Sequence, residues 1–258
     1  MNVAPHACGD VDFIVTCEHG GHRIPSRYRY LFRGQEALLR SHRGYDPGAL
    51  VMARALARAF AAPLVKSTTS RLLVDLNRST GHPRLFSTQT RGASSEVRAR
   101  IIAHYYRPYR TEVQRLVQQA IARGRRVVHI SSHSFTPELN GTLRVADVGL
   151  LYHPGRPAEV DLCERWKSAL ETRLPALRVR RNYPYAGKGD GLVTHLRRSV
   201  APDAYIGVEL EVNQRIVFQA GRGWAALQAG LVDSLRAAAK DNARIQVAAV
   251  DLSSSYRS

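Results

Sequence analysis

Cysteine is scarce in this sequence, and no stretch of it is apolar over a long distance. The three cysteines, Cys8, Cys17 and Cys163, are widely spaced and form no Cys-x-x-Cys pair. An odd number of scattered cysteines argues against a disulfide framework and favours a reducing compartment. No apolar run reaches the roughly 20 residues that cross a bilayer, and residues 1–10 lack the features of a secretory signal. We therefore expect a cytoplasmic protein without a membrane-spanning helix.

Acidic residues are also few, since 21 Asp and Glu stand against 38 Lys and Arg and leave a formal net charge of +17. Such a charge is typical of proteins that bind nucleic acid, an anionic surface or acidic small molecules. The arginines are scattered, however, and the sequence has no RNP-like aromatic motif, zinc-finger spacing or basic heptad pattern. The composition favours solvated basic faces that also attract acidic small molecules. A nucleic-acid-binding protein is the less favoured alternative.

Short β-branched runs alternate with helical patterns along the whole chain, and no repeat or linker divides it. Helices are predicted at 47–60, 96–122 with a kink or break near Pro108, 160–174 and 224–239. Strands are predicted at 13–16, 63–65, 72–76, 127–131, 148–152, 177–180 and 206–212. This alternation predicts an α/β architecture with a mostly parallel sheet, in which ligands bind at the carboxyl ends of the strands.

Histidines follow two of the predicted strands. His19 and His22 lie three residues apart in a glycine-containing loop after the first strand, and His133 follows the strand at 127–131. Histidine is a common zinc ligand, and glycine lets the backbone fold closely around an ion. Paired histidines on a loop are also frequent as polar surface groups, so the segments taken singly leave both interpretations open.

Carboxylates and an arginine occupy two further strand ends. Asp75, Asn77 and Arg78 end the apolar run at 72–76, where a planar guanidinium suits capture of a carboxylate and Asp75 can orient a metal-bound histidine. A helix cap beside a solvated arginine is the alternative interpretation. Glu209 and Glu211 share one face of a predicted central strand, where a carboxylate is costly unless it is paired, metal-bound or catalytic.

The order of these sites along the chain resembles that of zinc carboxypeptidase-like hydrolases. Matches to one family within that group are VTCEHGGHRIP at 15–25, HRGYDPGA at 42–49, SRLLVDLNR at 70–78, HYYRPYR at 104–110, ADVGLLY at 146–152, NYPYAG at 182–187 and EVN at 211–213. In these segments the chain resembles the N-formylglutamate amidohydrolase family over roughly residues 11–239.

The resemblance implies a fold and an activity. The implied fold is a three-layer α/β/α arrangement with a mostly parallel mixed sheet, zinc carboxypeptidase-like, in a single domain over residues 1–258 with its core at about 11–239. The implied activity is hydrolysis of the amide of an anionic N-acyl amino acid, such as N-formylglutamate, with one zinc ion per chain. A non-catalytic protein that binds such acids on the same fold is the alternative, and an esterase or nuclease with the same metal is less favoured.

The resemblance also implies roles for single residues. His19 and His133 match the metal-binding histidines, with either His22 or Asp46 as the additional ligand. Glu211 matches the general base that later acts as general acid, with Glu209 as the second candidate. The remaining expectations are Arg71 for oxyanion stabilisation, Asn77, Arg78 and Arg144 for substrate binding, and Asp75 for orientation of a histidine ligand.

Overall fold

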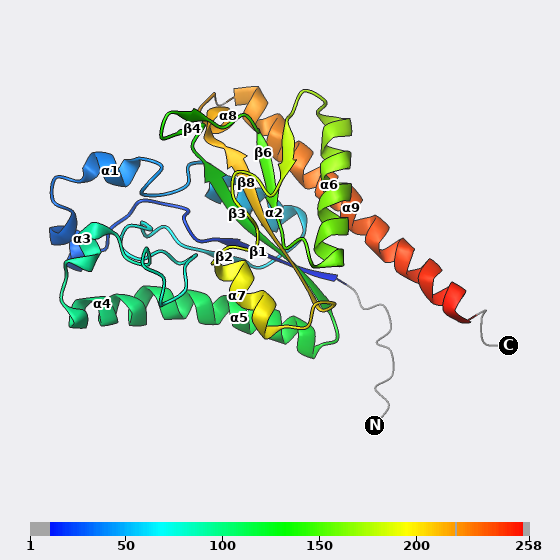
Figure 1. The fold of residues 1–258 in the computed structure, drawn as a ribbon, viewed down its shortest axis with the longest axis horizontal. Helices are drawn as coiled ribbons and strands as arrows, with labels where there is room; N and C mark the ends of the chain where they lie inside the picture. The colour runs from blue at the N-terminus through cyan, green and yellow to red at the C-terminus, as the bar shows by residue number, and fades with distance from the viewer. Residues whose placement is uncertain (1–10, 220, 255–258) are drawn as a thin grey trace.

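A six-stranded sheet forms the centre of the protein (Figure 1). The computed structural model describes residues 11–219 and 221–254. In spatial order the strands are β2 (Leu64–Lys66), β1 (Val11–Cys17), β3 (Arg126–Phe135), β8 (Tyr205–Asn213), β6 (Val148–Leu151) and β7 (Val179–Arg181). All neighbouring pairs are parallel except β6 and β8, which run antiparallel. The predicted α/β class with a mostly parallel, mixed sheet is therefore confirmed.

Helices cover both faces of this sheet, so the fold has three layers. One hydrophobic core joins the sheet to α2 (Ala49–Ala59), α6 (Pro157–Arg173) and α9 (Gly221–Ser254). A second core joins the opposite face to the 3-10 helix η1 (Ser26–Phe32), α4 (Ser95–Ile101), α5 (Arg107–Ala122) and α7 (Leu192–Ser199). Each fully buried Val, Leu or Ile in these cores contributes about 1.5–3 kcal/mol through removal of apolar surface from water.

The two faces of the central strands differ in polarity. Along β3, Val128 and Ile130 belong to the first core, whereas His129 and His133 alternate with them and point to the other face. Along β8, Leu210 likewise points to the first core. The alternation therefore brings a row of polar side chains onto the α5 and α7 side of the sheet.

The long helix predicted at 96–122 does not break at Pro108. It continues from α4 through η2 (Ile102–Tyr106), a π-helical turn, into α5, where proline stands at the start of the helix. Proline has no N–H for an α-helical bond to the carbonyl four residues before it. The wider turn that precedes it absorbs this defect, so the prediction of a kink or break is corrected to a local change of helical pitch.

Two further predictions need correction, and one helix was not predicted. The segment at 72–76 is buried but turns, because Leu73 donates its N–H to Ser70 and Asp75 donates to Leu85 rather than to a neighbouring strand. The strand predicted at 127–131 extends to Phe135, so His133 lies inside the strand and not after it. Helix α7 was not predicted, since its sequence is short and begins in a glycine-rich loop.

Short elements complete the described chain. They are α1 (Glu36–Arg40), α3 (Thr88–Arg91), the hairpin of β4 (Glu138–Leu139) and β5 (Thr142–Leu143), and α8 (Gln214–Gln219). Cys17 and Cys163 are buried free thiols, while Cys8 lies outside the described residues. Within residues 11–219 and 221–254, no helix is both long and apolar enough to cross a membrane.

Candidate active site

A cavity of about 440 Å³ opens where β1, β3 and β8 end. This is the edge at which ligands bind in parallel sheets. The cavity is lined by His19, His42, Asp46, Arg71, Asn77, Arg78, Arg84, His133, Ser134, Phe135, Thr136, Leu139, Leu151, Tyr185, Ala186, Gly189, Asp190, Glu209, Glu211 and Gln214. The lining therefore combines histidines, carboxylates and arginines from segments far apart in the sequence.

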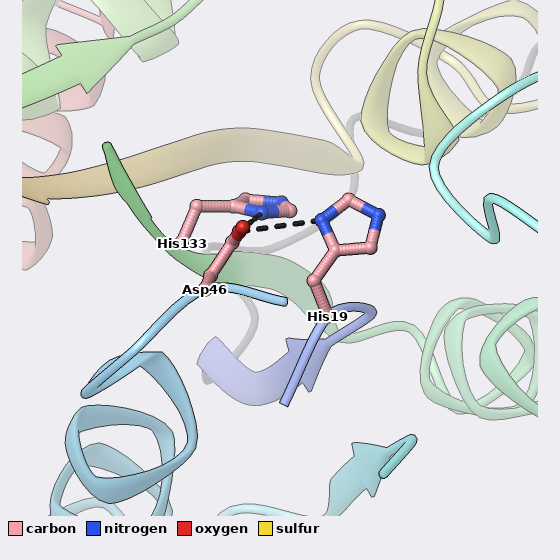
Figure 2. Close-up of side chains that lie close together, drawn as sticks. All are labelled: His19, Asp46 and His133. Carbon is pink, nitrogen blue, oxygen red and sulfur yellow. Dashed lines mark hydrogen bonds and ion pairs between the residues drawn. The ribbon is translucent and has the colours of Figure 1, made fainter. Parts of the chain in front are cut away.

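Three buried residues that line this cavity point toward one another (Figure 2). His19 follows β1, Asp46 precedes α2, and His133 lies on β3. Asp46 Oδ2 lies 3.2 Å from His19 Nδ1 and 2.9 Å from His133 Nδ1. One ligand atom from each residue lies within 4.8 Å of the others, so the group is able to hold a metal ion. Two imidazole nitrogens and a carboxylate oxygen are a donor set that suits zinc.

Local backbone packing brings His19 and Asp46 together. The loop after β1 runs against the segment at 67–69, and a Cβ on Gly21 would lie only 2.7 Å from the Thr68 carbonyl oxygen. A side chain at Gly21 would therefore force the loop away from the cavity. Asp46 donates its backbone N–H to the His19 carbonyl oxygen at 2.9 Å, which fixes the two residues side by side.

A second carboxylate anchors the outer nitrogen of each histidine. His19 Nε2 lies 2.7 Å from Asp75 Oδ1, and His133 Nε2 lies 3.0 Å from Glu18 Oε2. Glu18 also accepts hydrogen bonds from Ser131 Oγ at 2.7 Å. These contacts leave both Nδ1 atoms directed at Asp46, which is the arrangement of a histidine ligand oriented by a carboxylate. The expected role of Asp75 matches this position.

Electrostatics within the cluster favour ionised carboxylates and a protonated His133. Burial alone would raise the pKa of Glu18, but hydrogen bonds from His133 and Ser131 hold it well below its usual range. Burial likewise opposes ionisation of Asp46, and the neighbouring His19 and His133 outweigh it and lower the pKa. Against its own burial, hydrogen bonds to Asp46 and Glu18 raise the pKa of His133. His133 therefore forms a buried ion pair with Asp46.

Arg71 bridges the two aspartates of the cluster. Its Nη1 lies 3.2 Å from Asp46 Oδ1 and its Nη2 lies 2.9 Å from Asp75 Oδ2. Burial would lower the pKa of Arg71, but both carboxylates raise it, so the guanidinium stays charged. The side chain still lines the cavity. Arg71 holds the acidic groups in place, and its expected contact with an oxyanion stays a prediction.

Glu211 stands beside His133 on the adjacent strand. The two residues are register partners in the β3–β8 pair, and Glu209 pairs in the same way with Ser131. Burial raises the pKa of Glu211 to about 8, and the charges of Asp46 and Glu209 act in the same direction. Burial also raises the pKa of Glu209.

The carboxyl group of Glu211 is incompletely paired. Among the described residues, only Glu211 Oε2 and Tyr28 Oη are buried side-chain atoms without a hydrogen-bond partner. A buried polar atom without a partner is destabilising by about 1–3 kcal/mol, and such atoms in native structures call for an explanation. Glu211 therefore has one carboxyl oxygen without a partner, and the residue lines the cavity together with His19, Asp46 and His133.

The expected substrate-binding residues lie around the same cavity. Asn77 Oδ1 accepts a hydrogen bond from the backbone N–H of Leu192 at 2.7 Å, and Arg78 Nη1 donates to the Asp190 carbonyl at 2.8 Å. Within the described part of the chain, Arg78 forms no ion pair, so its positive charge is available to an anion. Arg144 does not itself line the cavity but donates to Tyr185 Oη at 3.1 Å, and Tyr185 does line it.

His22 lies apart from the other candidate ligands. It is exposed, its ring centroid lies 4.9 Å from that of Tyr45, and it does not line the cavity. The loop buries His19 at the end of β1 and leaves His22 exposed, just before Arg23 bonds to the Thr68 carbonyl. Of the two alternatives for the additional ligand, the structure brings Asp46 to the group and leaves His22 outside it.

Two residues of this site were not identified from the sequence. Glu18 is fully buried and contacts both Ser131 and Tyr109 Oη, which donates to Glu18 Oε1 at 2.9 Å. His42 lines the cavity from the loop before Asp46. A carboxylate directly before a metal-binding histidine at a strand end was the available signal for Glu18. Nothing in the spacing of His42 distinguishes it from a surface residue.

A known protein family matches most of this chain. The model of the N-formylglutamate amidohydrolase family matches residues 11–218, which include His19, Asp46 and His133. The chain belongs to the N-formylglutamate amidohydrolase family. This family consists of hydrolases, and membership in it implies a small-molecule substrate.

Several solved structures are similar to this protein. A gene product from Agrobacterium tumefaciens is 29% identical, with a TM-score of 0.77, and the alignment covers 89% of this chain and 91% of that chain. The N-formylglutamate amidohydrolase from Ralstonia eutropha JMP134 is 21% identical, with a TM-score of 0.64 and coverage of 90% and 94%. At this identity the second likeness shows a shared fold. No curated protein matches the sequence.

Proposed function

We propose that this protein is a zinc-dependent hydrolase that cleaves the amide bond of an N-formyl or similar N-acyl amino acid, such as N-formylglutamate. Family membership supports the reaction class. The observation that carries the proposal is the unpaired Oε2 of buried Glu211, which stands beside His133 and lines the cavity. A carboxylate in this position is suited to accept a proton from water during amide hydrolysis.

The residues that would hold the ion are His19, Asp46 and His133, with one zinc per chain. They fit the ion because their donor atoms already converge and because Asp75 and Glu18 anchor the outer nitrogens of the histidines. Three protein ligands leave a coordination position open, as catalytic zinc requires. When bound, zinc would polarise the acyl carbonyl, make water more acidic and favour the ionised form of Glu211.

Glu211 supplies the proton transfers. We assign it as the general base that takes a proton from the attacking water at Oε2 and then gives that proton to the departing nitrogen. The oxygen of water bonds to the acyl carbon, the bond from acyl carbon to nitrogen breaks, and a carboxylic acid and an amine leave. Glu209, two residues earlier on the same face, is the second candidate for this role.

Cationic and amide groups would orient the substrate. Asn77 and Arg78 form one part of the wall and would bind the α-carboxylate, since Arg78 lines the cavity and forms no ion pair with the described residues. Arg144, which contacts the cavity-lining rings of Phe135 and Tyr185, would bind a second anionic group beside them. Arg71, fixed by Asp46 and Asp75, would stabilise the negative charge that develops on the acyl oxygen.

A pair of matched variants tests this assignment. Glu211→Gln keeps the shape of the side chain but cannot accept the proton, so we expect kcat for N-formyl-L-glutamate to fall by about 10²–10⁴-fold. Zinc content should stay at the wild-type value, since Glu211 is not a ligand. Glu209→Gln lies on the same strand and should lose less activity. A larger loss in Glu209→Gln would transfer the role to Glu209, and full activity in both variants would refute the mechanism.

A further inference from the structure

A chain of buried hydrogen bonds lies behind the metal-binding group and outside the cavity. It consists of Thr16 on β1, His129 on β3 and Tyr205 on β8, and all three side chains are fully buried. Thr16 Oγ1 lies 2.9 Å from His129 Nε2, and His129 Nδ1 lies 2.6 Å from Tyr205 Oη. None of the three residues lines the cavity, so none of them contacts a substrate there.

The chain ends at the carboxylate that anchors His133. Thr16 stands two residues before Glu18, and hydrogen bonding from its side chain helps to lower the pKa of the Glu18 carboxyl group. Glu18 accepts from Tyr109 Oη at 2.9 Å and from Ser131 Oγ at 2.7 Å. His133 Nε2 lies 2.9 Å from the same Ser131 Oγ and 3.0 Å from Glu18 Oε2. Thr16 is thus the link between His129 and the group that orients a metal-binding histidine.

Counting protons fixes the direction of each hydrogen bond. A carboxylate only accepts, so the single hydroxyl proton of Thr16 points to Glu18. Thr16 Oγ1 must then accept from His129 Nε2–H. Neutral His129 has a lone pair on Nδ1, which accepts the hydroxyl proton of Tyr205. One tautomer of His129 therefore satisfies all three residues, and every donor in the chain points towards Glu18.

We propose that Thr16, His129 and Tyr205 are positioning residues for metal binding. They hold the Glu18 carboxylate, which pairs with His133 Nε2 directly and through Ser131 Oγ and so keeps His133 Nδ1 directed at the ion. The inference rests on the proposed function, because the ion itself belongs to that proposal. The inference adds Thr16, His129 and Tyr205, which lie behind Glu18, to the residues that orient His133. Removal of an outer partner of a histidine ligand typically weakens metal affinity by about 10–100-fold, and a partner one step further out should act at or below the lower end of that range.

Isosteric variants remove a hydroxyl group at each end of this series of hydrogen bonds. Thr16→Val removes the hydroxyl next to Glu18, and Tyr205→Phe removes the hydroxyl next to His129 without change of the ring. The matched control is Ser132→Ala, which removes a buried hydroxyl from the opposite face of β3, where Ser132 donates to the Ala49 carbonyl at 2.9 Å. Thr16→Ser keeps a hydroxyl and should restore the wild-type behaviour.

Two measurements on the intact protein test the proposal. Nitrogen NMR of the metal-free protein should show His129 as the Nε2–H tautomer, with a mixture of tautomers in Tyr205→Phe. Competition with a chelator should show zinc binding about 10-fold weaker in Thr16→Val, less affected in Tyr205→Phe, and unchanged in Ser132→Ala and Thr16→Ser.

Distinct outcomes overturn the inference or the proposed function. An Nδ1–H or doubly protonated His129 at neutral pH overturns the inference, and so does a loss of zinc affinity in Thr16→Val no larger than that in Ser132→Ala. A wild-type protein that takes up no zinc overturns the proposed function instead. In that case the ring-nitrogen signals of His133 decide the inference: a change in Thr16→Val supports it, and no change overturns it.

Discussion

Two clusters of buried charge in this protein differ in how completely they are paired. Glu159 on α6 and Arg197 on α7 form the first, with Arg197 Nε 2.9 Å from Glu159 Oε1. The other Glu159 oxygen accepts from the backbone N–H of His153 at 2.8 Å. Arg197 donates to the carbonyls of Gly187 and Gly207. This pair is saturated and does not line the cavity at the carboxyl end of the sheet.

The cluster around Asp46 is the opposite case. Its oxygen Oδ2 is shared by the Nδ1 atoms of His19 and His133, and Glu211 Oε2 has no partner. Both clusters are buried, so burial alone does not distinguish an ion pair that stabilises the fold from a reactive site. The difference lies in the convergence of His19, Asp46 and His133 and in the unpaired oxygen of Glu211, which are the features expected where a ligand completes the pairing.

The largest expected difference in stability follows from this contrast. Glu159→Gln should lower the free energy of unfolding by about 3–5 kcal/mol, because it leaves the Arg197 guanidinium buried without an opposite charge. In metal-free protein at pH 7, Glu211→Gln should cost little, since burial raises the pKa of Glu211 to about 8 and its carboxyl group is already neutral. Urea unfolding of both variants measures the difference. Equal losses would show that the two clusters have the same structural role.

A smaller expected effect is the contribution of His129 to the pH dependence of the free energy of unfolding. Burial lowers its pKa from 6.5 to about 4, so the unfolded chain binds a proton within this interval and the folded protein does not. The contribution of neutral His129 is complete above pH 6.5 and is lost as the pH falls towards 4, by about 3 kcal/mol. In His129→Gln this part of the pH dependence should be absent from urea unfolding curves. An unchanged slope would mean that His129 is charged in the folded protein.

The smallest of these expected effects is the loss of zinc affinity when Asp75 is replaced. Asp75→Asn removes the charge that anchors His19 Nε2, and zinc binding should weaken by about 10–100-fold in competition with a chelator. Asp147→Asn is the control, because Asp147 is also a buried carboxylate but pairs with Arg215 away from the cavity. Its zinc affinity should equal that of the wild type. Equal losses in both variants would indicate a general effect of buried charge.

The sequence predicted the sheet well because its signals are local. Alternation of apolar and polar residues along β3 and β8 depends only on neighbouring residues, and so does the position of Glu211 on a buried strand. The run at 72–76 was predicted as a strand from the same kind of signal. It has the composition of a strand, but no strand of the sheet lies beside it, and a single segment carries no information about its partner.

The metal-binding group shows the limit of such reasoning. His19 and His133 were expected from the family resemblance, whereas the choice between His22 and Asp46 depends on how two loops pack. The contact of the Asp46 N–H with the His19 carbonyl decides that packing, and the two residues are 27 positions apart. The hydrogen bonds that join Tyr205, His129 and Thr16 are still less accessible from sequence, because these residues come from three different strands and share no spacing.

Zinc content per chain tests the central claim most directly. Elemental analysis of purified protein, after incubation with zinc and removal of excess, should find about one zinc per wild-type chain and per His22→Ala chain. His133→Ala should contain almost none, because it removes a direct ligand from the group around Asp46. A wild-type protein that takes up no zinc, or a variant pair in which His22→Ala loses the metal and His133→Ala retains it, would contradict the account.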